Sequence, residues 1–196
     1  PVTVKHRIGI DDLDTDALLT NFVDRVALAG ASRFAVHARK AWLEGLDPKQ
    51  NRTIPPLQYE RVISLKQRRP ELTIELNGGL DTPEQCLQAL QSCDGTMVGR
   101  AAYAHPLRWS CVDHLIYGDD ARIIRASDVV LGLIPHAEAH LARGGRLWDL
   151  CRHLVQLVEA VPGARHCVRN LGVNAQRPGA DLNVLKEAAR QLLDAG

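Results

Sequence analysis

Four short apolar runs in the first hundred residues are each followed by polar or glycine residues that could bind an anion. These groups are Lys5-His6-Arg7, His37-Ala38-Arg39, Asn77-Gly78-Gly79 and Gly99-Arg100. Glycine lets a backbone N–H approach an anion closely, and lysine and arginine supply positive charge. Two glycine groups in successive units indicate a phosphate site, although tight turns explain such glycines as well.

Two of these residues could contact a cofactor directly. Lys5, at the expected end of the first strand, could hold negative charge on a phosphate or on a reduced cofactor ring. Alternatively, Lys5 could pair with a nearby carboxylate. His37, at the end of the second strand, could donate a hydrogen bond to a cofactor or be a structural histidine. The residue types alone leave both questions open.

The elements that must position these residues alternate along the chain. Apolar runs predict strands at 2–4, 34–36, 72–76 and 95–98, and apolar spacing predicts helices at 14–29, at 59–68 and from Pro83 onward. Gly30 suits a helix C-cap, and Asp81 or Thr82 suits an N-cap. This order favours a parallel sheet with crossover helices. In (β/α)₈ barrels the carboxyl ends of the strands build the active site, and four units make half of such a barrel.

After Pro106 the alternation stops and helical spacing takes over. Helices are predicted over 121–143, 147–161 and 181–195, with glycine and proline between them. We therefore expect an α/β domain followed by an all-α one. Residues 1–118 would form the C-terminal half of a TIM (β/α)₈ barrel, and residues 119–196 would form a small helical bundle.

The composition is that of an ordinary globular protein, with 45% hydrophobic residues and a net charge of +1. No apolar run approaches the ~18 residues of a membrane span, and the first residues do not resemble a signal peptide. The five cysteines are Cys86, Cys93, Cys111, Cys151 and Cys167. Their odd number and their spacing predict neither a disulfide framework nor a metal site, so we expect reduced thiols in a cytoplasmic protein.

Basic residues gather in two stretches despite the small net charge. The stretches contain Lys49, Arg52, Arg61, Lys66, Arg68 and Arg69, and then Arg143, Arg146, Arg152, Arg165 and Arg169. Such stretches bind phosphates in some proteins and are solvated helix surfaces in others. A long loop rich in proline and glycine, at 41–56, carries part of the first stretch and is a candidate binding loop.

Several segments together resemble one protein family. The segments 2–11, 36–46, 48–52, 77–79 and 97–100 are similar to the second half of the flavin-dependent tRNA-dihydrouridine synthases. The His-Ala-Arg-Lys-Ala-Trp-Leu stretch, 37–43, and Pro-Gly-Ala-Arg, 162–165, resemble the A-type branch of that family. The resemblance keeps the order and spacing of these motifs over nearly the whole chain.

The resemblance implies an oxidoreductase that acts on RNA. In this family FMN, reduced by NADPH, passes a hydride to a uridine of the tRNA D-loop, and a cysteine supplies the proton that completes 5,6-dihydrouridine. It implies that Lys5 and His37 contact the flavin. It also implies a phosphate arm bound by Asn77, Gly78, Gly79, Gly99 and Arg100.

The same resemblance implies contacts with tRNA by Lys49, Arg52 and Arg165. Arginine suits bidentate phosphate contacts, and folded RNA is recognised largely by its shape and backbone. The sequence departs from the A-type pattern at Cys167 and Val168, where an aromatic residue and a second arginine would be expected; Arg169 could substitute. Arg39 and Lys40 are further candidates for substrate contacts, with surface ion pairs as the alternative.

No catalytic residue is assigned within this chain. The family's catalytic cysteine lies in an Asn-rich, Cys-Pro loop of the N-terminal half-barrel, and none of the five cysteines here has that context. We expect that half, a part of the flavin site included, to lie outside this sequence, and the isolated chain to be inactive. Cys86 and Cys93 are interpreted as core or surface thiols.

Two other functions fit part of the pattern. A non-catalytic tRNA-binding module would bind RNA through the helical domain and retain no flavin. Another FMN or sugar-phosphate barrel enzyme would share the Gly-Gly and Gly-Arg groups, but would have no reason to carry the 38–43 loop or the C-terminal helices. Flavin absorbance separates the first of these from the synthase.

Overall fold

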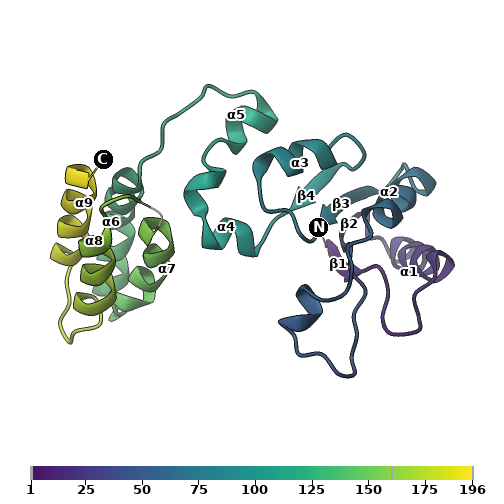
Figure 1. Ribbon diagram of the computed structural model, residues 1–196, viewed down its shortest axis with the longest axis horizontal. Helices are drawn as coiled ribbons and strands as arrows, with labels where there is room; N and C mark the ends of the chain where they lie inside the picture. Colours follow the sequence, from purple (N-terminus) through teal and green to yellow (C-terminus); the bar gives the residue numbers. More distant parts are fainter. Residues whose placement is uncertain (1, 160, 196) are drawn as a thin grey trace. The chain divides into compact units, whose positions relative to one another are not determined.

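In the computed structural model, which describes residues 2–159 and 161–195, four strands pair into one parallel sheet (Figure 1). The strands are β1 (Val4–Arg7), β2 (Arg33–His37), β3 (Thr73–Asn77) and β4 (Gly95–Met97), and they pair in sequence order. The register aligns Arg7 with His37, His37 with Asn77, and Asn77 with Met97. The expected parallel sheet is confirmed, and its carboxyl ends form one row.

Three helices alternate with these strands: α1 (Asp16–Leu28), α2 (Tyr59–Arg68) and α3 (Pro83–Ala89). The helix α1 begins where the Thr15 side chain accepts the Leu18 N–H, and Gly30 follows its last turn with φ +103°. The helix α3 begins with a capping box between Thr82 and Gln85. These side chains satisfy backbone groups that the first turn of a helix leaves without partners.

The two faces of the sheet differ in chemistry because neighbouring residues of a strand point to opposite sides. Phe34, Val36, Ile74 and Leu76 alternate on one face and are at most 2% exposed. The helix α1 covers this face, since the His6 ring lies 5.0 Å from Phe22 and 6.0 Å from Phe34. The main apolar core of the first unit therefore lies between this face and the helices.

The opposite face carries polar side chains in place of an apolar core. Arg7, His37 and Asn77 lie in one row of this face, and Lys5, Ala35 and Glu75 lie in the next. The Glu75 carboxylate is buried, and it accepts a hydrogen bond of 2.6 Å from Arg33 Nε. Such a face suits a ligand better than a dry interior.

Two strand ends differ from the expectation. The first strand runs to Arg7, so Lys5 lies inside β1 and does not end it. Asn77, expected in a turn, is the last residue of β3. In both cases the neighbouring strand offers backbone partners, which extend the ladder through polar residues that the apolar runs did not include.

Contacts divide the chain into two units, residues 1–99 and 100–196, and the second is built of helices where it is described. Its helices are α4 (Arg100–Ala104), α5 (Val112–Tyr117), α6 (Ala126–Ala142), α7 (Trp148–Glu159), α8 (Arg165–Arg169) and α9 (Asn183–Ala195). Two shorter turns are η2 (Pro106–Trp109) and η3 (Asn170–Asn174). The core of this unit includes Val130, Cys151, Leu171 and Leu185, all fully buried, and α6 packs along α9.

The boundaries in the second unit differ in part from those expected. Residues 100–117 fall within this unit, and the domain boundary after residue 118 stays a prediction. The helix predicted from residue 121 begins at Ala126, because Arg125 is extended and its N–H bonds Asp128 instead of continuing a helix. None of the helices in the described residues combines the length and apolarity of a membrane span.

The sheet core should carry much of the stability of the first unit. Phe34→Ala removes a fully buried ring and should cost about 3–5 kcal/mol in the free energy of unfolding, because the cavity cannot close completely. Leu28→Ala, at a side chain that is 89% exposed, should change it by less than about 0.5 kcal/mol. Urea unfolding followed by circular dichroism measures both, and equal losses would contradict this account of the core.

Candidate functional site

The carboxyl ends of the four strands are joined by backbone and side-chain hydrogen bonds. Beyond the paired strands, Ile8 N–H donates to His37 O over 3.2 Å, and Ala38 N–H donates to Asn77 O over 2.9 Å. Asn77 Nδ2 then donates to Met97 O over 2.6 Å. His37 and Asn77 are both at least nine-tenths buried. The edge that the sequence singled out is thus a fixed surface with polar groups in defined places.

Gly78 and Gly79 form a turn that lies against His37. Both residues have positive φ, +107° and +66°, which side chains rarely allow. A Cβ on Gly78 would lie 3.1 Å from His37 Nε2, and one on Gly79 would lie 2.5 Å from a Leu57 methyl carbon. Tyr59 Oη donates to Gly78 O over 2.7 Å. Leu57 and the hydroxyl of Tyr59 therefore hold this turn, and no sequence pattern had pointed to them.

Gly99, which follows β4, differs from this pair. Its φ lies outside the positive range, and a Cβ there would meet no atom within 4 Å. Neither backbone strain nor packing therefore requires glycine at this position. Arg100, the next residue, begins α4 in the second unit.

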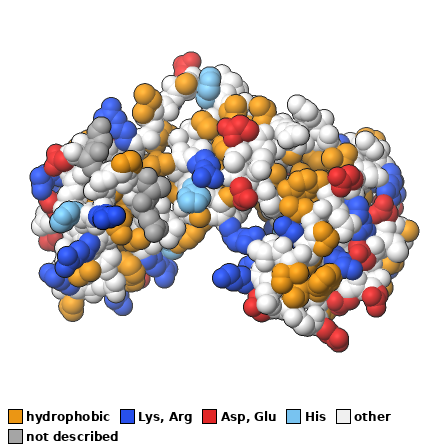
Figure 2. Space-filling model, in the orientation of Figure 1, with side chains coloured by type: hydrophobic (Ala, Val, Ile, Leu, Met, Phe, Trp, Pro, Cys, Tyr) orange, Lys and Arg blue, Asp and Glu red, His pale blue; other side chains and the backbone are white. Residues whose placement is uncertain are grey.

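Ion pairs divide the basic residues of the first unit into two groups. On the helix side Arg61, Lys66, Arg68 and Arg69 each pair with an aspartate. Among the described residues, no carboxylate pairs with Lys5, Arg7, Arg39 or Lys49, which lie on the polar face or in the segment after β2. Figure 2 shows acidic and basic side chains interspersed on the surface of the first unit. The first basic stretch is therefore not one continuous basic surface.

Arg39 and Lys40, considered as substrate contacts, are both held by the protein. Lys40 Nζ lies 3.1 Å from an Asp14 carboxylate oxygen and 5.7 Å from the centre of the Trp42 ring. Arg39 Nη1 donates to Pro55 O. Partial burial alone would raise the pKa of Asp14, but hydrogen bonds from Arg61 and Lys40 lower it below its usual value. The surface-ion-pair alternative therefore describes Lys40 well.

Lys49 and Arg52 are exposed at η1 (Gln50–Arg52), a single turn in the long loop. An Asp47 carboxylate oxygen accepts the N–H groups of Lys49, over 2.7 Å, and of Gln50, over 2.8 Å. This local cap explains why a turn forms at this point of an otherwise irregular segment. Both basic residues are thus exposed at a turn whose backbone is held by Asp47.

In the second unit, Arg165 and Arg169 lie four residues apart on α8, which places them on the same side of the helix. Both are exposed, and no carboxylate of the described residues pairs with either. Cys167 is fully buried, and Val168 packs against the core of the unit. Unlike Cys167 and Val168, Arg169 is therefore exposed on this helix and can offer a positive charge to a ligand.

Comparison with known proteins decides the family. The family model described as Dihydrouridine synthase (Dus) matches residues 1–193. The chain belongs to the dihydrouridine synthase family. It is 47% identical over 188 residues to the tRNA-dihydrouridine(20/20a) synthase of Shewanella oneidensis, covering 96% of this chain and 56% of that protein.

Other curated relatives carry the same name. Identity is 45% to the synthases of the same name from Vibrio parahaemolyticus and Escherichia coli K12, with 98% and 99% of this chain covered. The matches cover 59% and 56% of those proteins, so the chain spans less than two thirds of the relatives' length. The family assignment confirms the resemblance seen in the sequence.

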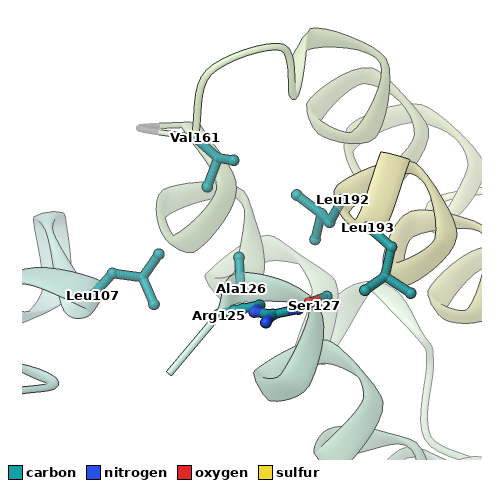
Figure 3. A pocket seen from close by; sticks show the side chains of 7 residues that line it. All are labelled: Leu107, Arg125, Ala126, Ser127, Val161, Leu192 and Leu193. Carbon is teal, nitrogen blue, oxygen red and sulfur yellow. The ribbon is translucent and has the colours of Figure 1, made fainter. Parts of the chain in front are cut away.

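The second unit also contains a cavity of about 420 Å³ that no sequence motif indicated (Figure 3). It is lined by Leu107, Arg125, Ala126, Ser127, Val161, Leu192 and Leu193. Apart from Arg125 and the Ser127 hydroxyl, its lining side chains are apolar, so it offers no acid or base for chemistry. We assign it no part in the reaction of the dihydrouridine synthase family.

The cysteines of this family member are packed as small apolar residues, with one exception. Cys86, Cys93, Cys151 and Cys167 are buried, and Cys111 is exposed. Burial raises the pKa of Cys151 and of Cys167 to about 11, so both remain thiols at neutral pH. The interpretation of Cys86 and Cys93 as packed thiols agrees with their exposed fractions of 2% and 6%.

Thiol titration with Ellman's reagent tests this assignment. One thiol per folded chain, that of Cys111, should react quickly at pH 8, and all five should react in denaturant, because the buried thiols are shielded and resist ionisation. Cys111→Ser should abolish the fast phase. Any fast-reacting thiol left in that variant would show that a buried cysteine is accessible.

Proposed function

We propose that this chain forms the C-terminal half of the FMN-binding (β/α)₈ barrel and the tRNA-binding helical domain of a tRNA-dihydrouridine synthase. The observation that carries the proposal is the separation of charges in the first unit. Cations on its helix side are paired with aspartates, whereas Lys5, Arg7, Arg39 and Lys49 are not. Cations that no carboxylate neutralises, near the carboxyl ends of parallel strands, suit an anionic ligand.

The residues present fit FMN. The turn at Gly78 and Gly79 has no room for side chains, and Gly99 leaves open space where a side chain would otherwise stand. Glycine N–H groups in such turns bind phosphate oxygens well. We assign the phosphate arm to Asn77, Gly78, Gly79, Gly99 and Arg100, and the ring to Lys5 and His37.

When bound, FMN that has been reduced by NADPH supplies the hydride for the 5,6 double bond of a uracil. Lys5 stabilises negative charge on the flavin ring. It lies on the polar face of the sheet, on the same side as His37. The part of His37, nearly buried beside the Gly78 turn, is to orient the ring by a hydrogen bond. We assign the proton donor to the part of the relatives that this chain does not match, because none of the five cysteines here lies in the Asn-rich, Cys-Pro context of the family's catalytic cysteine.

We assign RNA binding to the exposed basic residues. The relatives' name specifies tRNA and the positions 20 and 20a, and we propose D-loop uridines of the same kind for this protein. Lys49 and Arg52 would contact RNA from the loop of the first unit, and Arg165 and Arg169 from α8. The target uridine must leave its stack to meet the flavin, so these backbone contacts have to offset the cost of unstacking.

Flavin retention tests the cofactor assignment. The chain, incubated with FMN and passed through a desalting column, should retain flavin with a shifted visible spectrum. Lys5→Met should weaken binding about tenfold or more, because it removes the positive charge beside the ring. Arg25→Met removes an exposed charge on α1 and should have no effect. No retained flavin in a folded sample would leave a tRNA-binding module without catalysis as the function of this chain.

The salt dependence of tRNA binding tests the assignment of tRNA contacts to α8, independently of flavin. The double change Arg165→Ala and Arg169→Ala should weaken binding and lower the slope of log affinity against log salt by about one per lost phosphate contact. Arg190→Ala is the matched control, because Arg190 is paired with Glu187 and Asp194 on α9. Filter binding of a tRNA transcript over a series of KCl concentrations measures both. An unchanged slope would refute the role of α8.

A further inference from the structure

The loop between β2 and α2 has little apolar burial to hold its shape. Leu43 and Ile54 are 67% and 51% exposed, and the residues 43–54 are mostly exposed. A segment of this kind is ordered only if polar contacts fix its backbone. The side chains that make contacts across it include Asn51 and Arg7, beside Arg39, which donates to Pro55 O.

The Asn51 side chain joins the two arms of this loop. Its Oδ1 accepts the Trp42 N–H over 2.8 Å, and its Nδ2 donates to Trp42 O over 2.5 Å and to Leu46 O over 3.3 Å. The amide thus pairs with both backbone groups of Trp42, as a neighbouring strand would. Few other side chains can donate and accept in this way.

Arg7 holds this arrangement against the sheet. Its Nη1 donates to Asn51 O over 2.8 Å and to Lys40 O over 2.9 Å, contacts that are distant in sequence. Arg7 is the residue of β1 that the register aligns with His37, so it ties the loop to the row at the carboxyl edge. Burial lowers the pKa of Arg7, and so do the charges of Arg39 and Arg52, which places Arg52 near the same guanidinium.

We propose that Asn51 and Arg7 are positioning residues, which fix Lys49 and Arg52 at the carboxyl edge of the sheet for binding RNA phosphates. The inference rests on the proposed function for its ligand. Lys49 and Arg52 lie two residues before and one residue after Asn51, so any movement of Asn51 moves both. A loop that is shaped before RNA arrives avoids the entropy cost of ordering it on binding.

Hydrogen exchange of the whole chain tests the contacts without RNA or flavin. Asn51→Ala and Arg7→Met should each speed exchange of the Trp42 amide about tenfold or more, because its acceptor is lost or displaced. Amides of β2 and β3 should exchange as before, which separates loosening of the loop from unfolding. Thr53→Ala is the matched control, because its hydroxyl bonds only Lys49 and Gln50 within the same turn. An unchanged Trp42 amide in both variants would overturn the proposal.

Arg7→Lys is the second variant if Arg7→Met does not fold. It keeps the positive charge but not the planar group that reaches two carbonyls, so the Trp42 amide should still exchange faster. Exchange at the wild-type rate in Arg7→Lys would show that only charge is needed at this position, and would remove Arg7 from the proposal.

A double-mutant cycle in tRNA binding tests the positioning role. Asn51→Ala should weaken binding about tenfold. The joint change Lys49→Ala and Arg52→Ala should then cost less in that background than in the unaltered chain, because misplaced cations contribute less. Additive losses would show that Asn51 does not act through these cations and would overturn the proposal. Absence of tRNA binding by the unaltered chain would overturn the proposed function, while the exchange rates would still decide whether Asn51 and Arg7 shape the loop.

Discussion

The register of the parallel ladder is the constraint on which the rest of the site depends. Because Arg7, His37, Asn77 and Met97 are aligned, residues far apart in sequence reach one edge together. A slip by one residue would turn the polar side chains toward the helices and the apolar ones away from them. The buried apolar face, with Phe34 and Ile74 at its centre, therefore fixes the positions of polar groups that it never contacts.

Charge is distributed according to what each part of the first unit must do. On the helix side, arginine and lysine are neutralised by aspartates and link α1, α2 and the strands. At the carboxyl edge, burial lowers the pKa of Arg7, and the charges of Arg39 and Arg52 lower it further. Groups whose pKa is shifted by burial and by neighbouring charges are common at functional sites and in structural charge networks.

The sequence predicted the order of strands and helices in the first unit because apolar spacing there follows directly from burial. A cap at Asp81 or Thr82, of which the structure uses Thr82, and the polar groups after each strand were equally accessible from residue types. The partner of Lys40, the contacts of Asn51 and the packing of Leu57 on Gly79 were not, since they join residues whose proximity arises only on folding. The start of α6 was misplaced because Ile123 and Ile124 continue the apolar spacing, although Ile123 is 87% exposed.

The order of the sheet bears on how the chain acquires its structure. Every strand pairs with its neighbour in sequence, so each β-α unit can add to the one before it without waiting for distant segments. Pairing between neighbouring units keeps the connecting loops short, which limits the entropy lost in closing them. During synthesis on the ribosome, β1, β2 and β3 can assemble in the order in which they emerge. The edge that gathers the polar row would then be built progressively, strand by strand, before the helical unit is complete.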